Sequence, residues 1–118
     1  MLSISDTNIE QFFPVFADTN VPVAFLVPTP TGYGKSIMDA TVPVRDLLLN
    51  AHVHNYSRQG QGPENKEIVT SYFVWEDGIQ ETSASLYRPK TKHGDPRIWF
   101  NNLKRYCVPC NLLALIVI

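Results

Sequence analysis

The residues best suited to bind a polyanion lie in one basic segment, Arg88-Pro-Lys-Thr-Lys-His-Gly-Asp-Pro-Arg97. Its first three basic residues alternate with proline and threonine, so an extended backbone would present them on one side. They are Arg88, Lys90 and Lys92. Phosphate neutralisation needs such a row of projecting charges. His93 and Gly94 make a turn possible, and we expect an arm that contacts nucleic acid.

An acidic residue inside this basic segment adds a possible means of reading bases. Asp95 cannot help to neutralise phosphates, but it can accept a hydrogen bond from cytosine N4, and Arg97 can pair with guanine O6 and N7. Adjacent C and G edges could be read in this way. The alternative is a solvated hairpin tip with an ordinary Asp–Arg ion pair.

A second candidate is Thr29-Pro-Thr-Gly-Tyr-Gly-Lys-Ser36, which resembles the nucleotide-binding pattern G-x-x-x-x-G-K-[ST]. Thr29 stands where the pattern requires its first glycine, and the residues that follow are poor helix formers. A flexible glycine-rich arm that contacts DNA phosphates and base edges fits this segment better. Its candidate DNA contacts are Tyr33, Lys35, Ser36 and Asp39.

A second enzyme-like pattern and a protein-interaction role are weaker alternatives. Asp46 and Glu64-Asn-Lys66 superficially resemble the D…E-x-K constellation of Mg²⁺-dependent nucleases, but Glu64 and Lys66 fall in a Gly-Gln-Gly-Pro loop. A small nuclease or nucleotide-binding enzyme is therefore the first alternative. A protein-interaction module whose basic arm docks an acidic partner is the second. We expect no catalytic residue, metal ligand or cofactor in this chain.

The two cysteines form a lone C-x-x-C, Cys107-Val-Pro-Cys110. A structural zinc site needs four ligands, and no second pair exists. A redox motif would need a βαβ context, which the sequence does not indicate. We expect two buried or half-buried free thiols.

The composition is typical of one domain with a core: 118 residues, 44% hydrophobic and 18% charged. The net charge of −1 hides an uneven distribution. Residues 1–87 carry four basic and ten acidic residues, whereas residues 88–118 carry six basic residues against Asp95 alone. A local positive region on a nearly neutral chain indicates a polyanionic partner better than the overall charge does.

Short strands with irregular connections and one or two small helices predict a mainly β fold of the pseudobarrel type. We expect a short helix over 6–16, an edge strand at Val21–Val27 and strands at Glu67–Glu76, Ile79–Tyr87, Arg97–Phe100 and Leu112–Ile118. An Asp-Gly hairpin should join the first two strands of the carboxyl-terminal half. We expect loops over residues 28–36, 54–66 and 88–96. An extended stretch broken by Pro43 should cover residues 37–45. A helical turn is expected over 46–51, and a turn or helical turn over 101–106.

Three segments in this order carry a family resemblance: Lys35–Thr41, Gly60–Lys66 and Ala84–Phe100. They resemble the amino-terminal DNA-recognition domain of EcoRII-type restriction endonucleases, a pseudobarrel that precedes an MvaI/BcnI-like nuclease domain. The resemblance covers about residues 24–118.

The resemblance implies a seven-stranded pseudobarrel, related to plant transcription-factor domains, with two arms that grip the major groove. The arms map to about Thr29–Thr41 and Arg88–Arg97, and the family's acid-x-Arg pair falls on Asp95 and Arg97. The implied target is a CC(A/T)GG-type site. Lys35 stands where such domains show a histidine, and the second arm carries two prolines, so the target can differ.

We therefore expect a single DNA-binding domain over residues 1–118, acting as the effector or target-recognition part of a restriction endonuclease. The expected partner is double-stranded DNA, and the nuclease domain with its Mg²⁺ would follow outside this chain. The apolar end, Asn111–Ile118, suggests a fragment of a longer protein and is too short to span a bilayer. With no secretory signal, we expect a monomer in the bacterial cytoplasm without a membrane partner.

Overall fold

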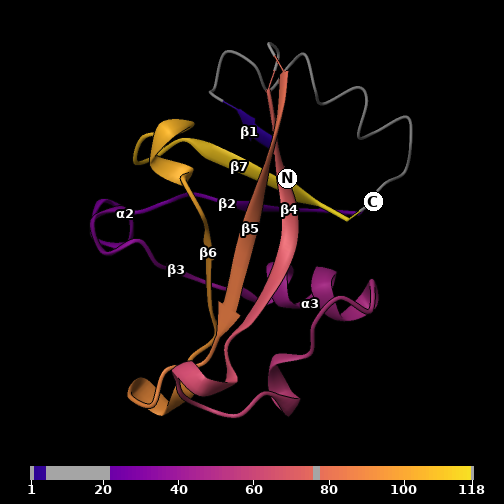
Figure 1. The fold of residues 1–118 in the computed structure, drawn as a ribbon, viewed down its shortest axis with the longest axis vertical. Helices are drawn as coiled ribbons and strands as arrows, with labels where there is room; N and C mark the ends of the chain where they lie inside the picture. The colour runs from indigo at the N-terminus through magenta and orange to yellow at the C-terminus, as the bar shows by residue number, and fades with distance from the viewer. Residues whose placement is uncertain (1, 5–21, 76–77, 118) are drawn as a thin grey trace.

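The computed structural model describes residues 2–4, 22–75 and 78–117, which are mainly β. They form one seven-stranded sheet in the order β2-β7-β1-β4-β5-β6-β3 (Figure 1). The strands are β1 (Leu2–Ile4), β2 (Val23–Leu26), β3 (Met38–Asp39), β4 (Glu67–Trp75), β5 (Gly78–Tyr87), β6 (Arg97–Phe100) and β7 (Leu112–Ile116). The helices are α2 (Pro30–Lys35) and α3 (Val42–Asn50), with 3-10 turns η1 (Tyr56–Arg58), η2 (Pro63–Asn65), η3 (Lys92–Gly94) and η4 (Leu103–Arg105). The expected mainly β fold with small helices is confirmed.

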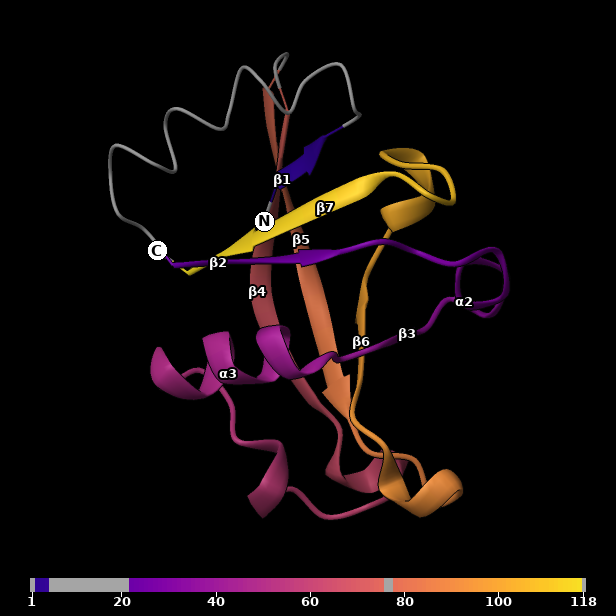
Figure 2. The same cartoon turned by 180° about the vertical axis from the view of Figure 1, so that it is seen from behind.

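The sheet is strongly curled. The short connection over residues 27–37 joins β2 to β3, which are the two edge strands of the sheet. Both ribbon views show β2 and β7 running across the long β4–β5 hairpin, with α2 at one side of the molecule (Figures 1 and 2). In the described residues β2 and β3 do not pair with each other, so the curl does not close.

The core lies inside this curl. Its fully buried large side chains come from four strands, α3 and the η4 turn: Phe73, Leu86, Ile98, Leu103, Leu113 and Val44. The Phe73 ring packs on Tyr106, with 4.4 Å between ring centroids. Helix α3 buries Val44, Leu47 and Leu48, the i, i+3, i+4 spacing of one helix face. This packing gives the surface turns a fixed base.

The strand predictions of the carboxyl-terminal half are confirmed. Trp75 pairs with Gly78, so β4 and β5 form the expected hairpin. Strand β6 has the predicted bounds, and β2 is an edge strand that pairs only with β7 among the described strands. The predicted helix over 6–16, the tip of the hairpin at 76–77 and Ile118 lie outside the described residues.

Two predictions in the amino-terminal half are wrong. Residues 28–36 were expected as a loop, but Thr29 caps a helix there and Pro30 takes its first position, where a missing N–H costs nothing. Residues 37–45 were expected as an extended stretch broken by Pro43. Instead a two-residue strand is followed by α3, in whose first turn Pro43 lies, and the expected turn at 46–51 is the end of that helix.

The cysteines are both free, and Cys107 is buried as expected while Cys110 is exposed, contrary to expectation. Burial raises the pKa of the Cys107 thiol to about 11, which keeps it neutral. No helix in the described part of the chain is long and apolar enough to cross a membrane.

Candidate nucleic-acid interface

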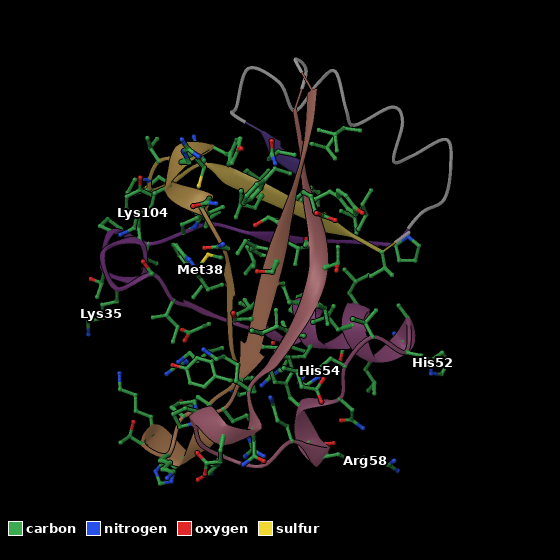
Figure 3. The ribbon with its side chains drawn as sticks, in the orientation of Figure 1. Lys35, Met38, His52, His54, Arg58 and Lys104 are labelled. Carbon is green, nitrogen blue, oxygen red and sulfur yellow. The ribbon has the colours of Figure 1, made fainter. Side chains whose placement is uncertain are left out.

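The first arm, residues 29–41, is shaped by its own backbone. The Thr29 hydroxyl accepts a hydrogen bond from the Gly32 amide at 3.0 Å, which caps α2. The helix ends at Ser36, which adopts a left-handed conformation with φ 55°. Lys35 and Ser36 are exposed, and Lys35 projects away from the body of the molecule (Figure 3). A free lysine at the end of a short rigid helix is well placed to meet an anion.

The second arm, residues 88–97, contains a tight turn at η3, where His93 and Gly94 made a turn possible. Lys92, His93 and Gly94 are consecutive left-handed residues, with φ of 52°, 57° and 70°. This turn follows Arg88 and Lys90 in the chain and ends just before Asp95. Lys92, His93 and Asp95 are exposed.

The basic residues of the second arm divide into braced and free side chains. Arg88 is half-buried and donates to the backbone carbonyl oxygens of Gly94 at 2.8 Å and Gln59 at 3.0 Å. Lys90 pairs with Glu64 at 3.6 Å, an exposed ion pair that water weakens. The ion pairs found among the described residues do not include Lys92, the other lysine of the arm.

Arg97 joins the two arms. Strands β3 and β6 pair with Asp39 opposite Arg97, and Arg97 Nη1 donates to Asp39 Oδ1. The Arg97 side chain is only 12% exposed, whereas that of Asp39 is 77% exposed. The partner of Arg97 is therefore an acid of the first arm, not its near neighbour Asp95. The Tyr56 hydroxyl donates to the Arg97 carbonyl oxygen at 3.0 Å and supports the strand from below.

One groove contains side chains from both arms. Lys35 and Asp39 of the first arm and Lys92 and Arg97 of the second arm all line it. The β3–β6 pairing explains this convergence, because it ties the end of the first arm to the end of the second. Four of the ten residues singled out from the sequence therefore meet at one place.

Two further basic residues lie at the same edge of the molecule. Lys104 and Arg105 are exposed in η4, and Lys104 Nζ lies 5.3 Å from the centroid of the Tyr33 ring. The Tyr33 hydroxyl donates to the Lys104 carbonyl oxygen at 3.5 Å. Both ribbon views place α2, η3 and η4 along one edge (Figures 1 and 2), and Lys35 and Lys104 project from it (Figure 3). We will call Lys35, Lys92, Lys104 and Arg105 the basic edge.

The sequence interpretation missed Lys104 and Arg105 as site residues. The signal was present, because both belong to the basic carboxyl-terminal region. The sequence does not show that Lys104 contacts Tyr33 of α2, some seventy positions earlier. Only the packing of η4 against this helix creates that contact.

The residues of the enzyme alternatives lie apart from this groove. Glu64 and Lys66 are exposed at the η2 turn, and Asp46 is exposed on α3. Among the described residues, no group of three or more His, Cys, Asp or Glu side chains is arranged to hold a metal ion. Residues 30–35 of the nucleotide-binding-like segment form α2 itself, whereas in a P-loop the corresponding residues form the loop that precedes the helix.

Comparisons with protein-family models, with curated proteins and with solved structures found no match for this chain. No relative therefore assigns a role to any of its residues. The function has to be inferred from the side chains and their geometry.

Proposed function

We propose that this chain binds double-stranded DNA with sequence specificity, with both arms in the major groove. The observation that carries this proposal is the convergence of the arms, with Lys35 and Lys92 lining one groove beside the paired Asp39 and Arg97. A major groove about 12 Å wide admits elements that project from a protein surface, and its base edges carry the sequence information. A merely solvated basic loop does not require an opposing second arm.

The basic edge is suited to contact phosphates. Its four side chains are exposed and come from three separate segments, α2, η3 and η4, which lie along one edge of the ribbon (Figure 1). Phosphate contacts set the position and register of a protein on DNA without reading sequence. They would hold the two arms over the major groove.

Arg97 and Asp95 are suited to read bases. Asp39 takes one of the five N–H donors of the Arg97 guanidinium and fixes its orientation, which leaves donors for guanine O6 and N7. Asp95 is exposed two residues earlier and can accept from cytosine N4. A guanidinium held in place before binding loses little side-chain entropy on binding.

We further propose that the curled sheet is a pseudobarrel and that the chain serves as the effector or target-recognition domain of an EcoRII-type restriction endonuclease. The resemblance of three sequence segments supports this, and the first and third of them fall on the two arms. The target would then be of the CC(A/T)GG type. The chain would act as a monomeric binding domain, and cleavage with Mg²⁺ would belong to a nuclease domain outside it.

The direct test is a fluorescence-anisotropy titration of labelled short duplexes, one with a CC(A/T)GG-type site and one scrambled, at several salt concentrations. We expect tighter binding of the cognate duplex. The logarithm of the affinity should fall with log salt by about 0.9 for each phosphate contact. Equal affinity for both duplexes would contradict sequence specificity.

A matched pair of arginine variants assigns the readout to the arm. Arg97→Ala removes the guanidinium that would bind guanine O6 and N7, so it should lose ~1–3 kcal/mol at one base pair. Arg58→Ala is the control, because Arg58 is exposed on the opposite side of the molecule from Lys35 (Figure 3). It should bind both duplexes as the unmodified chain does.

Other outcomes of the same experiment would favour the alternatives. Cleavage of the duplex by this chain in the presence of Mg²⁺ would favour a nuclease that uses Glu64 and Lys66. Absence of duplex affinity even at low salt would favour a protein-interaction module whose basic edge docks an acidic partner.

A further inference from the structure

The tip of the second arm has an unfavourable backbone conformation. Lys92 and His93 both have positive φ, and Gly94 continues the same left-handed turn. Residues with a Cβ rarely adopt this conformation, and two in succession are rarer still. Two backbone hydrogen bonds lie within the turn itself, from Gly94 N to Thr91 O at 3.0 Å and from Asp95 N to Lys92 O at 3.2 Å. A strained conformation persists only where surrounding contacts hold it.

Arg88 supplies the main contacts that hold the tip. Its Nε donates to the Gly94 carbonyl oxygen at 2.8 Å, and its Nη1 lies 3.0 Å from the Gln59 carbonyl oxygen and 3.5 Å from that of Tyr56. One guanidinium thus joins the end of the turn to a chain segment about thirty positions earlier. The backbone adds a further tie, since the Gly62 amide donates to the Arg88 carbonyl oxygen at 2.7 Å.

The segment that receives Arg88 is itself rigid. The Gln59 amide nitrogen donates to the carbonyl oxygens of Asn65 at 2.9 Å and Leu86 at 2.8 Å. Its side-chain oxygen lies 3.0 Å from Nε2 of His54, a buried residue whose Nδ1 lies 3.0 Å from Glu67 Oε2. Among the described residues, no buried side-chain polar atom lacks a hydrogen-bond partner. Fully satisfied buried networks of this kind fix one conformation.

We propose that Arg88 is a positioning residue of the DNA site. It does not contact DNA but holds the tip so that Lys92, His93 and Asp95 reach the major groove of the DNA. This proposal rests on the proposed function. The sequence alone places Arg88 with Lys90 and Lys92 as a phosphate contact. The geometry separates them, because Nε and Nη1 of the half-buried Arg88 donate to carbonyl oxygens of the protein, whereas Lys92 is exposed.

The salt dependence of binding distinguishes the two roles. We would measure affinity for the cognate and scrambled duplexes against salt for the unmodified chain and for Arg88→Lys, Arg88→Ala and Lys92→Ala. Lys92→Ala, the phosphate control, should reduce the slope of log affinity against log salt by about 0.9. Both Arg88 variants should behave alike, because lysine keeps the charge but cannot make the hydrogen bonds to Gly94 and Gln59 together. In both, the displaced tip should lower the slope as Lys92→Ala does and reduce the preference for the cognate duplex by ~10-fold or more.

A second measurement needs no variant. In the unmodified chain, the Arg88 Nε–H signal in nuclear magnetic resonance spectra should exchange slowly and should hardly move when the cognate duplex is added, while the Lys92 and His93 amide signals move. It decides the question if an Arg88 variant fails to fold.

Three results separate the two proposals. A slope that falls in Arg88→Ala but is kept in Arg88→Lys, or a large shift of the Arg88 Nε–H signal, would show a phosphate contact and overturn the positioning role. Folded Arg88 variants with an unchanged cognate preference would overturn it too. An unmodified chain that prefers neither duplex would instead contradict the proposed function.

Discussion

The two arms that meet at the groove are held in place in different ways. The helix of the first arm and the turn after it are built from contacts within residues 29–37, such as the Thr29 cap and the bond from the Ile37 amide to the Gly32 carbonyl oxygen at 3.0 Å. The second arm depends on residues about thirty positions away, through Arg88 and its acceptors Gln59 and Tyr56. A locally determined arm and a tertiary one thus converge at a single site.

This difference bears on how each arm can fail. A substitution in the first arm changes a helix of a few residues, whose own hydrogen bonds limit the damage. The second arm can be displaced by a change in the segment 54–66, which contributes none of the ten residues singled out from the sequence. We therefore expect the second arm to be more sensitive than the first to substitutions at distant positions.

The largest effect is expected from Gln59→Ala. Removing this buried amide takes away a partner of the Asn65 and Leu86 carbonyl oxygens and of His54 Nε2. The free energy of unfolding should therefore fall by ~2–3 kcal/mol. Chemical denaturation measures the change. Gln80→Ala is the control, because the exposed Gln80 amide donates only to the neighbouring Glu81 carbonyl oxygen, at 3.4 Å. Equal losses in the two variants would contradict the distant support of the second arm.

A pair of glycine substitutions compares the arms directly. Gly94 has φ 70°, and a Cβ there would lie 2.4 Å from Gln61 Nε2, so Gly94→Ala should lower the free energy of unfolding by ~1–2 kcal/mol. Gly34 lies in α2 with nothing within 4 Å of an added Cβ, so Gly34→Ala should raise it by ~0.5–1 kcal/mol. Thermal denaturation of both variants checks the opposite signs. Destabilisation by Gly34→Ala would refute the helical first arm.

The local cap of the first arm should have a smaller effect. Thr29→Ala removes the hydroxyl that accepts from the Gly32 amide and should cost ~1 kcal/mol of unfolding free energy. The matched control is Thr31→Ala, because Thr31 is exposed in the same helix. Urea denaturation of the two variants gives the difference. Equal changes in the free energy of unfolding for the two variants would contradict a stabilising cap at Thr29.

The smallest effect concerns alkaline pH and the support of the second arm. Burial raises the pKa of Tyr56 above its ordinary value of 10.0, an effect that Arg45 partly opposes. Because the unfolded chain then loses this proton before the folded chain does, stability should fall as pH rises above about 10. Cys107, with its pKa raised by burial from 9.0 to about 11, acts in the same direction from pH 9 upward.

Tyr56→Phe isolates the tyrosine contribution. The variant loses the hydrogen bond to the Arg97 carbonyl oxygen, so it should be less stable by ~1 kcal/mol at neutral pH. Its further loss of stability between pH 9 and 11 should nevertheless be smaller than that of the unmodified chain, since only Cys107 remains. Denaturation at a series of pH values tests this, and parallel curves would contradict it.

Much of the fold follows from the amino-acid sequence by itself. Alternation predicted β4 and β5, because side chains in a strand alternate between two faces, and a short, largely apolar segment predicted β6 with its bounds. The basic carboxyl-terminal region and the polar residues of both arms were also evident. Helix α2 was missed because glycine and proline indicate turns, although the capping threonine before Pro30 is a signal for a helix start.

The tertiary structure decided which of these residues work together. Asp95 and Arg97 are near neighbours in the sequence, yet Arg97 pairs with Asp39 because β3 lies beside β6 in the curled sheet. Arg88 and Lys92 belong to one basic run, yet Arg88 donates to the carbonyl oxygens of Gly94 and Gln59 while Lys92 is exposed. The sequence by itself determined the residue types, the local periodicity and the uneven charge. Strand pairing and the hydrogen bonds of buried groups depend on residues far apart in the chain, and they decided the geometry of the site.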